Sequence, residues 1–155
     1  IADPDGNPVT TREQAPTSTA FDGGEGIWVH EGIVYFTTKG DNRLWAYDIA
    51  DDSVSIVYDA GELVAPVLTG VDNIIVTPGG DVLVCEDGGD MQIVAITPTN
   101  AIIPILQIMG HTGSEVTGIA LDPSRTRLYF SSQRGTTSDA FMGGYTFEVT
   151  GPFFV

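Results

Sequence analysis

Residues 26–59 read GIWVHEGIVYFTTKGDNRLWAYDIADDSVSIVYD, and this stretch decides the fold. Short runs rich in β-branched and aromatic residues alternate with Gly, Asp and Asn, and the chain keeps helical apolar spacing for no more than about two turns. Each run has the length of one strand, and the residues between the runs are typical of tight turns. The stretch therefore predicts four consecutive antiparallel strands.

The same pattern returns twice further along the chain. It recurs in residues 73–108, NIIVTPGGDVLVCEDGGDMQIVAITPTNAIIPILQI, and in residues 118–137, GIALDPSRTRLYFSSQRGTT, followed by residues 143–151, GGYTFEVTG. Ile27, Ile74 and Ile119 are equivalent, 47 and 45 residues apart. The first two units contain a fourth strand, whereas the third shows three. Four strands in ~45 residues are typical of one blade of a β-propeller.

We therefore expect an all-β fold with about three four-stranded propeller blades, near residues 22–68, 69–112 and 113–155. Residues 1–21 are expected to be a linker or the end of a preceding blade. Propellers commonly have about 4–8 blades, so three blades would leave two exposed sheet edges. The chain is then expected to be a portion, such as half, of a six-bladed ring, completed by the rest of a longer chain or by a partner chain. A β-sandwich of about eleven strands is the alternative fold.

Composition narrows the classes of partner. The chain has 155 residues, of which 42% are apolar, enough for one domain with a real core. It carries 6 Lys and Arg against 21 Asp and Glu, a formal net charge of −15. Such a surface repels phosphate backbones and anionic lipid, so we expect no nucleic-acid partner, and the short apolar runs predict no membrane span. The single cysteine, Cys85, lies in the apolar run VLVC and is expected to be a buried thiol.

Acidic residues recur just before the first strand of each unit. Glu25 and Asp72 lie two residues before the equivalent isoleucine, and Glu115 lies four residues before it. First strands line the central channel of a propeller, so these side chains are expected to approach one axis. Three carboxylates near one axis repel one another unless a cation lies between them. Because hard oxygen ligands favour Ca²⁺, the pattern predicts a calcium site.

Further candidates lie at the ends of the second strands. Glu86 and Asp87 end the second strand of the middle unit, in CEDGGD, and are additional candidate metal ligands. Asp-Gly is also an ordinary turn pair, so a structural role stays open for Asp87. His111, in GHTGSE, and Arg134, after the second strand of the third unit, are weaker catalytic candidates. An arginine in that place could hold an anionic substrate.

Taken in order, EGIW, GDNRLWAYD, DNIIVTPGGDVLVCEDG and SEVTGIALDPSRTRLYFSSQ resemble the C-terminal half of the PhoX family of secreted alkaline phosphatases, grouped with bacterial proteins of the DUF839 type. The resemblance covers roughly residues 22–153. It implies a six-bladed propeller in which calcium and iron ions cleave phosphate monoesters, and a secreted or periplasmic location. It also implies metal-binding roles for Glu25, Glu86, Asp87 and Glu115. The family's iron-binding cysteine lies in its N-terminal half, so Fe³⁺ is expected only with residues outside this chain.

Three functions stay open. The first is a metal-dependent phosphate monoester hydrolase, or the C-terminal part of one. The second is a lactonase-like propeller hydrolase, in which one axial Ca²⁺ polarises a lactone carbonyl and an acid at the rim handles protons. The third is a non-catalytic calcium-binding segment that completes its ring with a partner chain by strand addition. Gly23 weighs against the first function, because the family commonly has a phosphate-binding arginine there.

Overall fold

The computed structural model describes residues 3–137 and 143–153. Within them the chain forms strands and two short 3-10 helices. The strands are β1 (Gly24–His30), β2 (Ile33–Thr38), β3 (Arg43–Asp48), β4 (Ser53–Asp59), β5 (Val71–Val76), β6 (Val82–Glu86), β7 (Gln92–Ile96), β8 (Ile102–Gln107), β9 (Val116–Leu121), β10 (Arg127–Ser132) and β11 (Tyr145–Thr150), and the helices are η1 (Thr11–Glu13) and η2 (Ala60–Glu62). The all-β prediction is confirmed.

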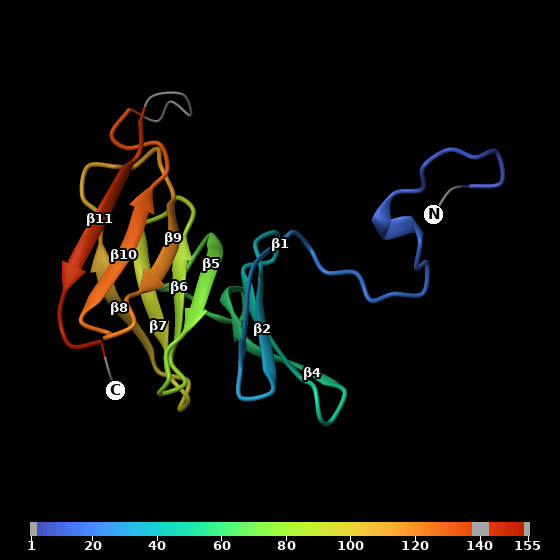
Figure 1. Ribbon diagram of the computed structural model, residues 1–155, viewed down its shortest axis with the longest axis horizontal. Coiled ribbons are helices and arrows are strands. Elements are labelled where there is room, and N and C mark those ends of the chain that lie inside the picture. Colours follow the sequence, from blue (N-terminus) through green and yellow to red (C-terminus); the bar gives the residue numbers. More distant parts are fainter. Residues whose placement is uncertain (1–2, 138–142, 154–155) are drawn as a thin grey trace.

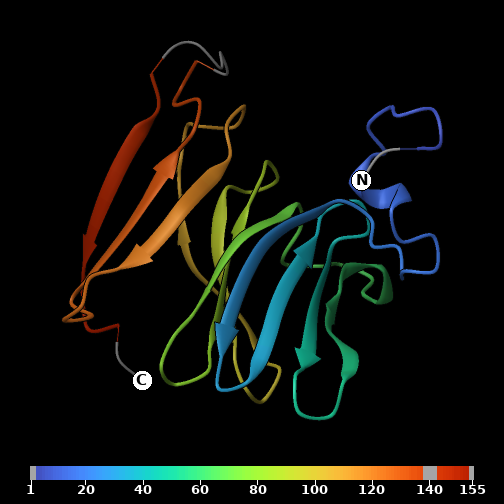
Figure 2. The same ribbon diagram turned by 45° about the vertical axis from the view of Figure 1, so that its right-hand side comes forward.

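The strands form three separate antiparallel sheets, which lie side by side (Figures 1 and 2). The order is β1-β2-β3-β4 in the first sheet, β5-β6-β7-β8 in the second and β9-β10-β11 in the third. We call these sheets blade 1, blade 2 and blade 3. Every sheet is a meander of strands adjacent in the sequence, and three successive sheets exclude a two-sheet sandwich. Blade 3 has three strands among the described residues.

Two apolar cores lie between the blades. The core between blades 1 and 2 includes Leu44, Tyr58, Val82, Val84 and Val94. The core between blades 2 and 3 includes Leu83, Cys85, Ile93, Leu128 and Phe130. Successive residues of a strand point to opposite faces, so β6 supplies alternate residues to the two cores. Blade 2 is therefore buried on both faces, which explains why its strands are almost continuously apolar.

The inner strands of the three blades are neighbours. Strand β1 packs against β5, and β5 packs against β9. Hydrogen bonds cross both junctions: Thr37 Oγ1 donates to the carbonyl oxygen of Asp72 at 2.7 Å, and Asn73 Oδ1 accepts from Thr117 Oγ1 at 2.7 Å and from the Gly118 N–H at 2.8 Å. The first strand of each repeat thus lies along the inside of the blade stack, as expected for a propeller.

The N-terminal segment leaves the blades. Residues 3–20, which include η1, run away from the sheets (Figure 1). The sheet strands fall at 24–59, 71–107 and 116–150, while the exact blade boundaries, 22–68, 69–112 and 113–155, stay predictions. In the described part of the chain, no helix combines the length and apolar character needed to cross a membrane.

Candidate metal centre at the rim of the blades

The start of each inner strand and the end of the following strand meet at one rim. The register pairs Gly24 with Thr38 in blade 1, Val71 with Glu86 in blade 2, and Val116 with Ser132 in blade 3. A register shift follows close to this pair in every blade. Residues that precede an inner strand, or follow a second strand, therefore lie on the same side of the molecule.

Three of the predicted acids come together at this rim. Asp72 lies in β5, Asp87 follows β6, and Glu115 precedes β9. One carboxylate oxygen from each lies within 4.8 Å of the others, and Asp72 and Glu115 are buried. The backbones of Asp87 and Glu115 also form an isolated antiparallel bridge, which joins blade 2 to blade 3. The group thus spans a junction between blades.

Two cationic side chains flank the carboxylates. Lys39 forms an ion pair with Asp87. Arg134 lies 3.3 Å from Glu115 and 3.9 Å from Asp87, measured from its guanidinium nitrogens to the carboxylate oxygens. Lys39 is the only lysine of the chain. It pairs with Asp87, and its charge also acts on Asp72. Three carboxylates against two cations still leave a net negative charge at the rim.

Asp72 is the carboxylate whose titration the site perturbs most clearly. Burial raises the pKa of Asp72, the nearby charge of Glu25 raises it further, and Lys39 and Asn73 lower it. Asn73 Nδ2 donates to Asp72 Oδ1 at 2.7 Å. Its environment therefore disfavours the charged form of Asp72, which is the situation that a bound cation would relieve.

Glu25 lies close to this group but outside it. Its side chain is exposed in β1, and it acts on Asp72 through its charge. The strand registers place Glu25 and Asp72 at equivalent positions, whereas Glu115 corresponds to Gly70 and Gly23. Glu115 therefore approaches Asp72 from a different register position of the repeat. Glu115 belongs to the group because its backbone pairs with Asp87, not because of the repeat.

Glu86 points away from the carboxylate group. It is fully buried, and its two carboxylate oxygens accept hydrogen bonds from the backbone N–H groups of Thr69 and Gln92, each at 2.9 Å. Burial raises the pKa of Glu86, and these two hydrogen bonds lower it. Because neighbours on a strand face opposite sides, Glu86 and Asp87 cannot both face the rim group. Glu86 thus ties the segment before β5 to the start of β7.

His111 is linked to the backbone at the rim through hydrogen bonds. Its ring is buried, and Nδ1 lies 2.8 Å from Ser132 Oγ. Ser132 Oγ donates to Ser114 Oγ at 2.8 Å, and Ser114 Oγ accepts from the Arg134 N–H at 2.8 Å. His111 thus anchors the backbone of Arg134 through two serines and does not itself join the carboxylate group.

Sequence reasoning missed the role of Lys39. The backbone N–H of Lys39 donates to the carbonyl oxygen of Gly23, and the backbone N–H of Asp87 donates to that of Gly70. Lys39 after β2 therefore occupies the same position in the repeat as Asp87 after β6. Comparing the residue types at this place between repeats would have found it. Cys85, by contrast, is buried as expected, and burial raises the pKa of its thiol.

An open groove of about 260 Å³ starts at the rim and follows the inner strands. Glu25, Asn73 and Gly118 line its polar part, and Ile75, Ile119 and Trp28 line its apolar part. A small organic molecule bound here would lie beside the rim and against an apolar wall.

Comparison with known proteins identifies the fold of the chain but does not assign it to a family. No protein-family model matches the chain, the PhoX family included, and no curated protein matches it. Solved structures do match: a luciferin-regenerating enzyme (19% identity, TM-score 0.63), a streptogramin B lyase (20%, 0.60) and a putative gluconolactonase (17%, 0.61). The matches cover 86%, 88% and 86% of this chain.

The chain spans less than half the length of these structures: 47% of the luciferin-regenerating enzyme, 43% of the lyase and 47% of the putative gluconolactonase. The likeness places the fold within the six-bladed β-propellers and confirms the propeller prediction. The chain is thus a propeller portion.

Proposed function

We propose that this chain is the metal-binding portion of a lactonase-like propeller hydrolase, in which Asp72, Asp87 and Glu115 hold one divalent cation, Ca²⁺ first. The observation that carries the proposal is the convergence of their carboxylate oxygens within 4.8 Å at a blade junction. The likeness to a putative gluconolactonase favours this reaction class over phosphate ester hydrolysis.

The residues fit the proposed ion. All three donors are carboxylates, which suits hard cations, and Ca²⁺–oxygen distances are about 2.3–2.6 Å. Two oxygens on one such ion lie at most about 5 Å apart, in agreement with the observed group. Because Lys39 and Arg134 are paired with the same carboxylates, a cation must compete with them, and we expect weak to moderate affinity.

When bound, the ion would polarise a carbonyl oxygen as a Lewis acid. The chain's own residues then have separate tasks. Glu25 is exposed beside Asp72 and is placed to exchange a proton with water or substrate at the rim. The Asn73 amide orients Asp72, and the apolar end of the groove at Trp28 and Ile119 would contact the organic part of a substrate.

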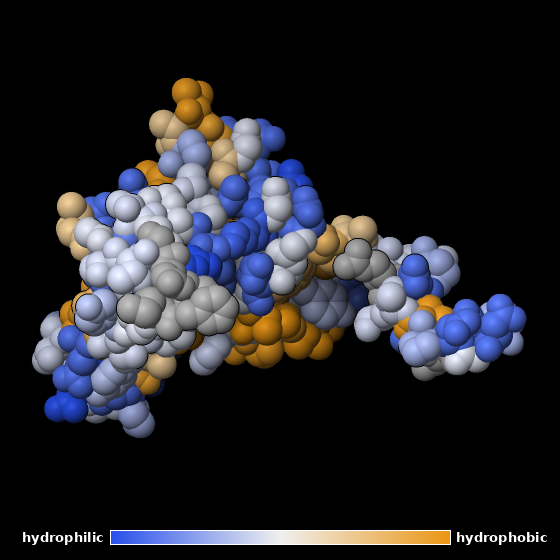
Figure 3. Space-filling model, turned by 90° about the horizontal axis from the view of Figure 1, so that it is seen from above, coloured by the Kyte–Doolittle hydropathy of each residue, from blue (hydrophilic) through white to orange (hydrophobic). Residues whose placement is uncertain are grey.

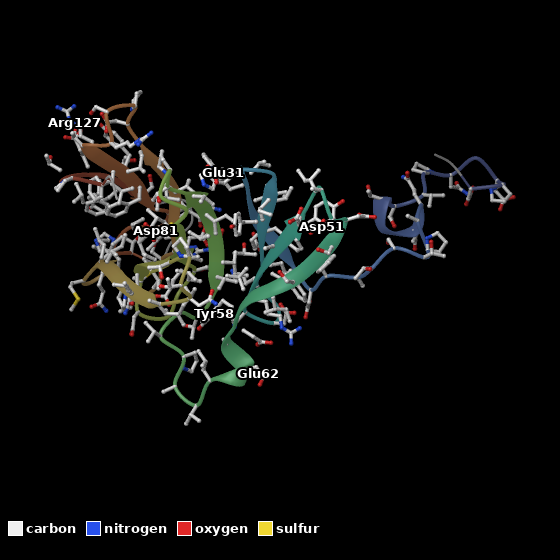
Figure 4. All side chains as sticks on the ribbon, turned by 90° about the horizontal axis from the view of Figure 1, so that it is seen from below. Glu31, Asp51, Tyr58, Glu62, Asp81 and Arg127 are labelled. Atoms are coloured by element: carbon white, nitrogen blue, oxygen red, sulfur yellow. The ribbon has the colours of Figure 1, made fainter. Side chains whose placement is uncertain are left out.

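The test is a calorimetric Ca²⁺ titration of the chain with the Asp72→Asn variant beside it. We expect the substitution to weaken binding by about 10–100-fold or more, since one ligand charge is lost. Asp51→Asn is the matched control, because Asp51 is an exposed acid on the β3–β4 turn of blade 1 (Figure 4). A chain that binds no Ca²⁺, or an Asp72→Asn variant that binds as well as the parent, would refute the metal proposal.

Phosphate monoester hydrolysis is the second candidate, and one observation favours it. The sequence lacks an arginine at Gly23, yet Lys39 and Arg134 bring two cationic groups to the rim. Assays with p-nitrophenyl phosphate and with a simple lactone, each with and without a chelator, separate the two reactions. Turnover of neither, together with a chelator-sensitive melting temperature, would leave a structural calcium site.

Further features of the whole protein stay proposals. We propose that the remaining blades lie outside these residues, in a longer chain or a partner chain, and that the protein is secreted or periplasmic. An iron ion would need ligands from those further blades.

A further inference from the structure

Blade 1 has an apolar face that no described residue of another blade covers. In antiparallel sheets, residues directly opposite one another share a face. One such row is Ile27, Phe36, Trp45 and Ile56, and the next is Val29, Val34, Tyr47 and Val54. We call these two rows the free face of blade 1. The other face of the blade carries Tyr35 and Leu44 into the core with blade 2.

The exposure on this face is large for apolar side chains. Ile27 is 66% exposed, Val29 is 60% exposed, and Val54 and Ile56 are each 48% exposed. The space-filling view shows apolar surface on the blades near the root of the N-terminal segment (Figure 3). Phe21, from that segment, packs edge-on against Phe36 and Trp45, with ring centroids 5.0 and 5.2 Å apart, and leaves the aliphatic positions open.

Blade 3 ends the stack on its other side with a face of different chemistry. Its outward rows pair Tyr129 with Ala120 and Glu148, and Ser131 with Thr117 and Thr146. Tyr129 Oη donates to Glu148 Oε2 at 2.7 Å, and the hydroxyls of Ser131 and Thr146 lie 3.0 Å apart. We call these rows the free face of blade 3. Their polar groups are satisfied within the sheet and remain compatible with water.

We propose that the free face of blade 1 is a docking surface for an additional propeller blade with an apolar face, supplied by protein outside these 155 residues. The two existing junctions show what such a joint contains, since both are made of branched aliphatic and aromatic rows. The match covers less than half of each solved structure, so a protein of that length has room for further blades. The inference extends the proposed propeller hydrolase but does not depend on its metal.

A second copy of this chain is the wrong occupant for a closed ring. Closing a ring from two copies would press the free face of blade 1 against the free face of blade 3. The Glu148 carboxylate and the Tyr129 hydroxyl would then be buried against isoleucine and valine. Burying a charge without a new partner is strongly unfavourable, so the two halves of the ring differ in sequence.

The experiment uses thiol labelling, because Cys85 is fully buried and gives a low background. Ile56→Cys reports on the free face of blade 1. Asp51→Cys, on the exposed β3–β4 turn of the same blade, is the matched control outside that face. A neutral maleimide is added to the 155-residue chain and to the full gene product that contains it. We expect both variants to react fast in the short chain, and Ile56→Cys alone to react on the order of tenfold or more slowly in the full product.

Three results would overturn the inference. The first is an Ile56→Cys reaction that is equally fast in both proteins. The second is slowing that appears in the short chain as its concentration rises, which would identify a second copy as the occupant. The third is equal slowing of Asp51→Cys in the full product, which would show that the slowing is not specific to the free face of blade 1.

Two checks keep the result interpretable. If Ile56→Cys does not fold, as judged by circular dichroism, Val54→Cys reports on the same face. A Ca²⁺ titration of the same samples is read separately, so loss of metal binding would count against the proposed function and not against this surface.

Discussion

Blade 2 and blade 1 have similar repeat sequences and very different surroundings. All five residues of β6 are buried, whereas six of the seven residues of β1 are partly or fully exposed. The difference comes from neighbours: blade 2 is packed on both sides, and blade 1 on one. In a stack of sheets, burial is therefore a property of position in the stack more than of the strand's own sequence.

The largest expected effect is on stability in blade 2. Ile93→Ala, at a fully buried position, should lower the free energy of unfolding by about 2–5 kcal/mol, because it leaves a cavity. Ile27→Ala, on the free face of blade 1, should change it by about 0.5 kcal/mol or less. Urea denaturation of both variants measures the difference. Equal losses would mean that the free face of blade 1 is packed in solution.

The next effect concerns two neighbouring acids. Glu86→Gln should destabilise the chain by about 1–3 kcal/mol, because a buried N–H then faces an amide NH₂ in place of a carboxylate oxygen. Asp87→Asn should affect Ca²⁺ binding more than folding, since Asp87 faces the rim. Denaturation and calorimetry on both variants check the division. A Glu86→Gln chain with normal stability and lost Ca²⁺ binding would restore Glu86 as a ligand.

The two blades should also differ in how pH acts on them. The pKa of Asp72 in blade 2 is raised above its ordinary value of 3.8 by burial. The carboxyl group of Asp72 therefore keeps its proton to a higher pH in the folded chain than in the unfolded chain. The stability that this proton contributes is fully present below the pKa of unfolded Asp72 and is lost as the pH rises through the pKa of folded Asp72. In blade 1, the hydrogen bond from Arg43 lowers the pKa of Asp59, so its contribution is lost as pH falls through the folded pKa.

Denaturation between pH 3 and pH 7 in a chelator tests this contrast. Asp72→Asn should flatten the loss of stability on raising the pH from about 4, and Asp59→Asn should flatten the loss on lowering it. Shifts in the same direction would contradict the assignment. Ca²⁺ affinity should fall as the pH drops through the raised pKa of Asp72, because the proton and the cation compete for one carboxylate.

The smallest effect is expected on the free face of blade 3. Arg127 and Glu148 form an exposed pair with 3.6 Å between nitrogen and oxygen, and Arg127 lies far from blade 1 (Figure 4). Glu148→Gln should change the free energy of unfolding by about 0–1 kcal/mol, measured in low salt. A larger loss would indicate that this face is buried against a partner.

Much of the fold followed from the sequence because the repeat is strong. Aligning Ile27, Ile74 and Ile119 located each inner strand, and the turn residues between the runs separated the others. Short motifs rich in Gly and Asp at strand ends are common in the turns of any such fold. They therefore resembled the PhoX family without a family match to support it.

The candidate site was harder to predict. Asp72, Asp87 and Glu115 were among the predicted ligands, but their grouping depends on a backbone bridge between blades that no local pattern encodes. Glu86 and Asp87 were both candidate ligands, and the alternation of side chains at the end of the strand separates them. Lys39 was missed because the pattern that predicted the site consists of acids alone.

Asn73 gives the junction between blades 2 and 3 a mechanical role. Its amide oxygen receives two hydrogen bonds from blade 3, and its amide nitrogen donates to Asp72. Sliding one blade past the other would turn this amide and reorient the carboxylate with it. A cation held by Asp72, Asp87 and Glu115 would then resist sliding of the two sheets against each other. A force that displaces the sheets would in turn lower the affinity for the ion.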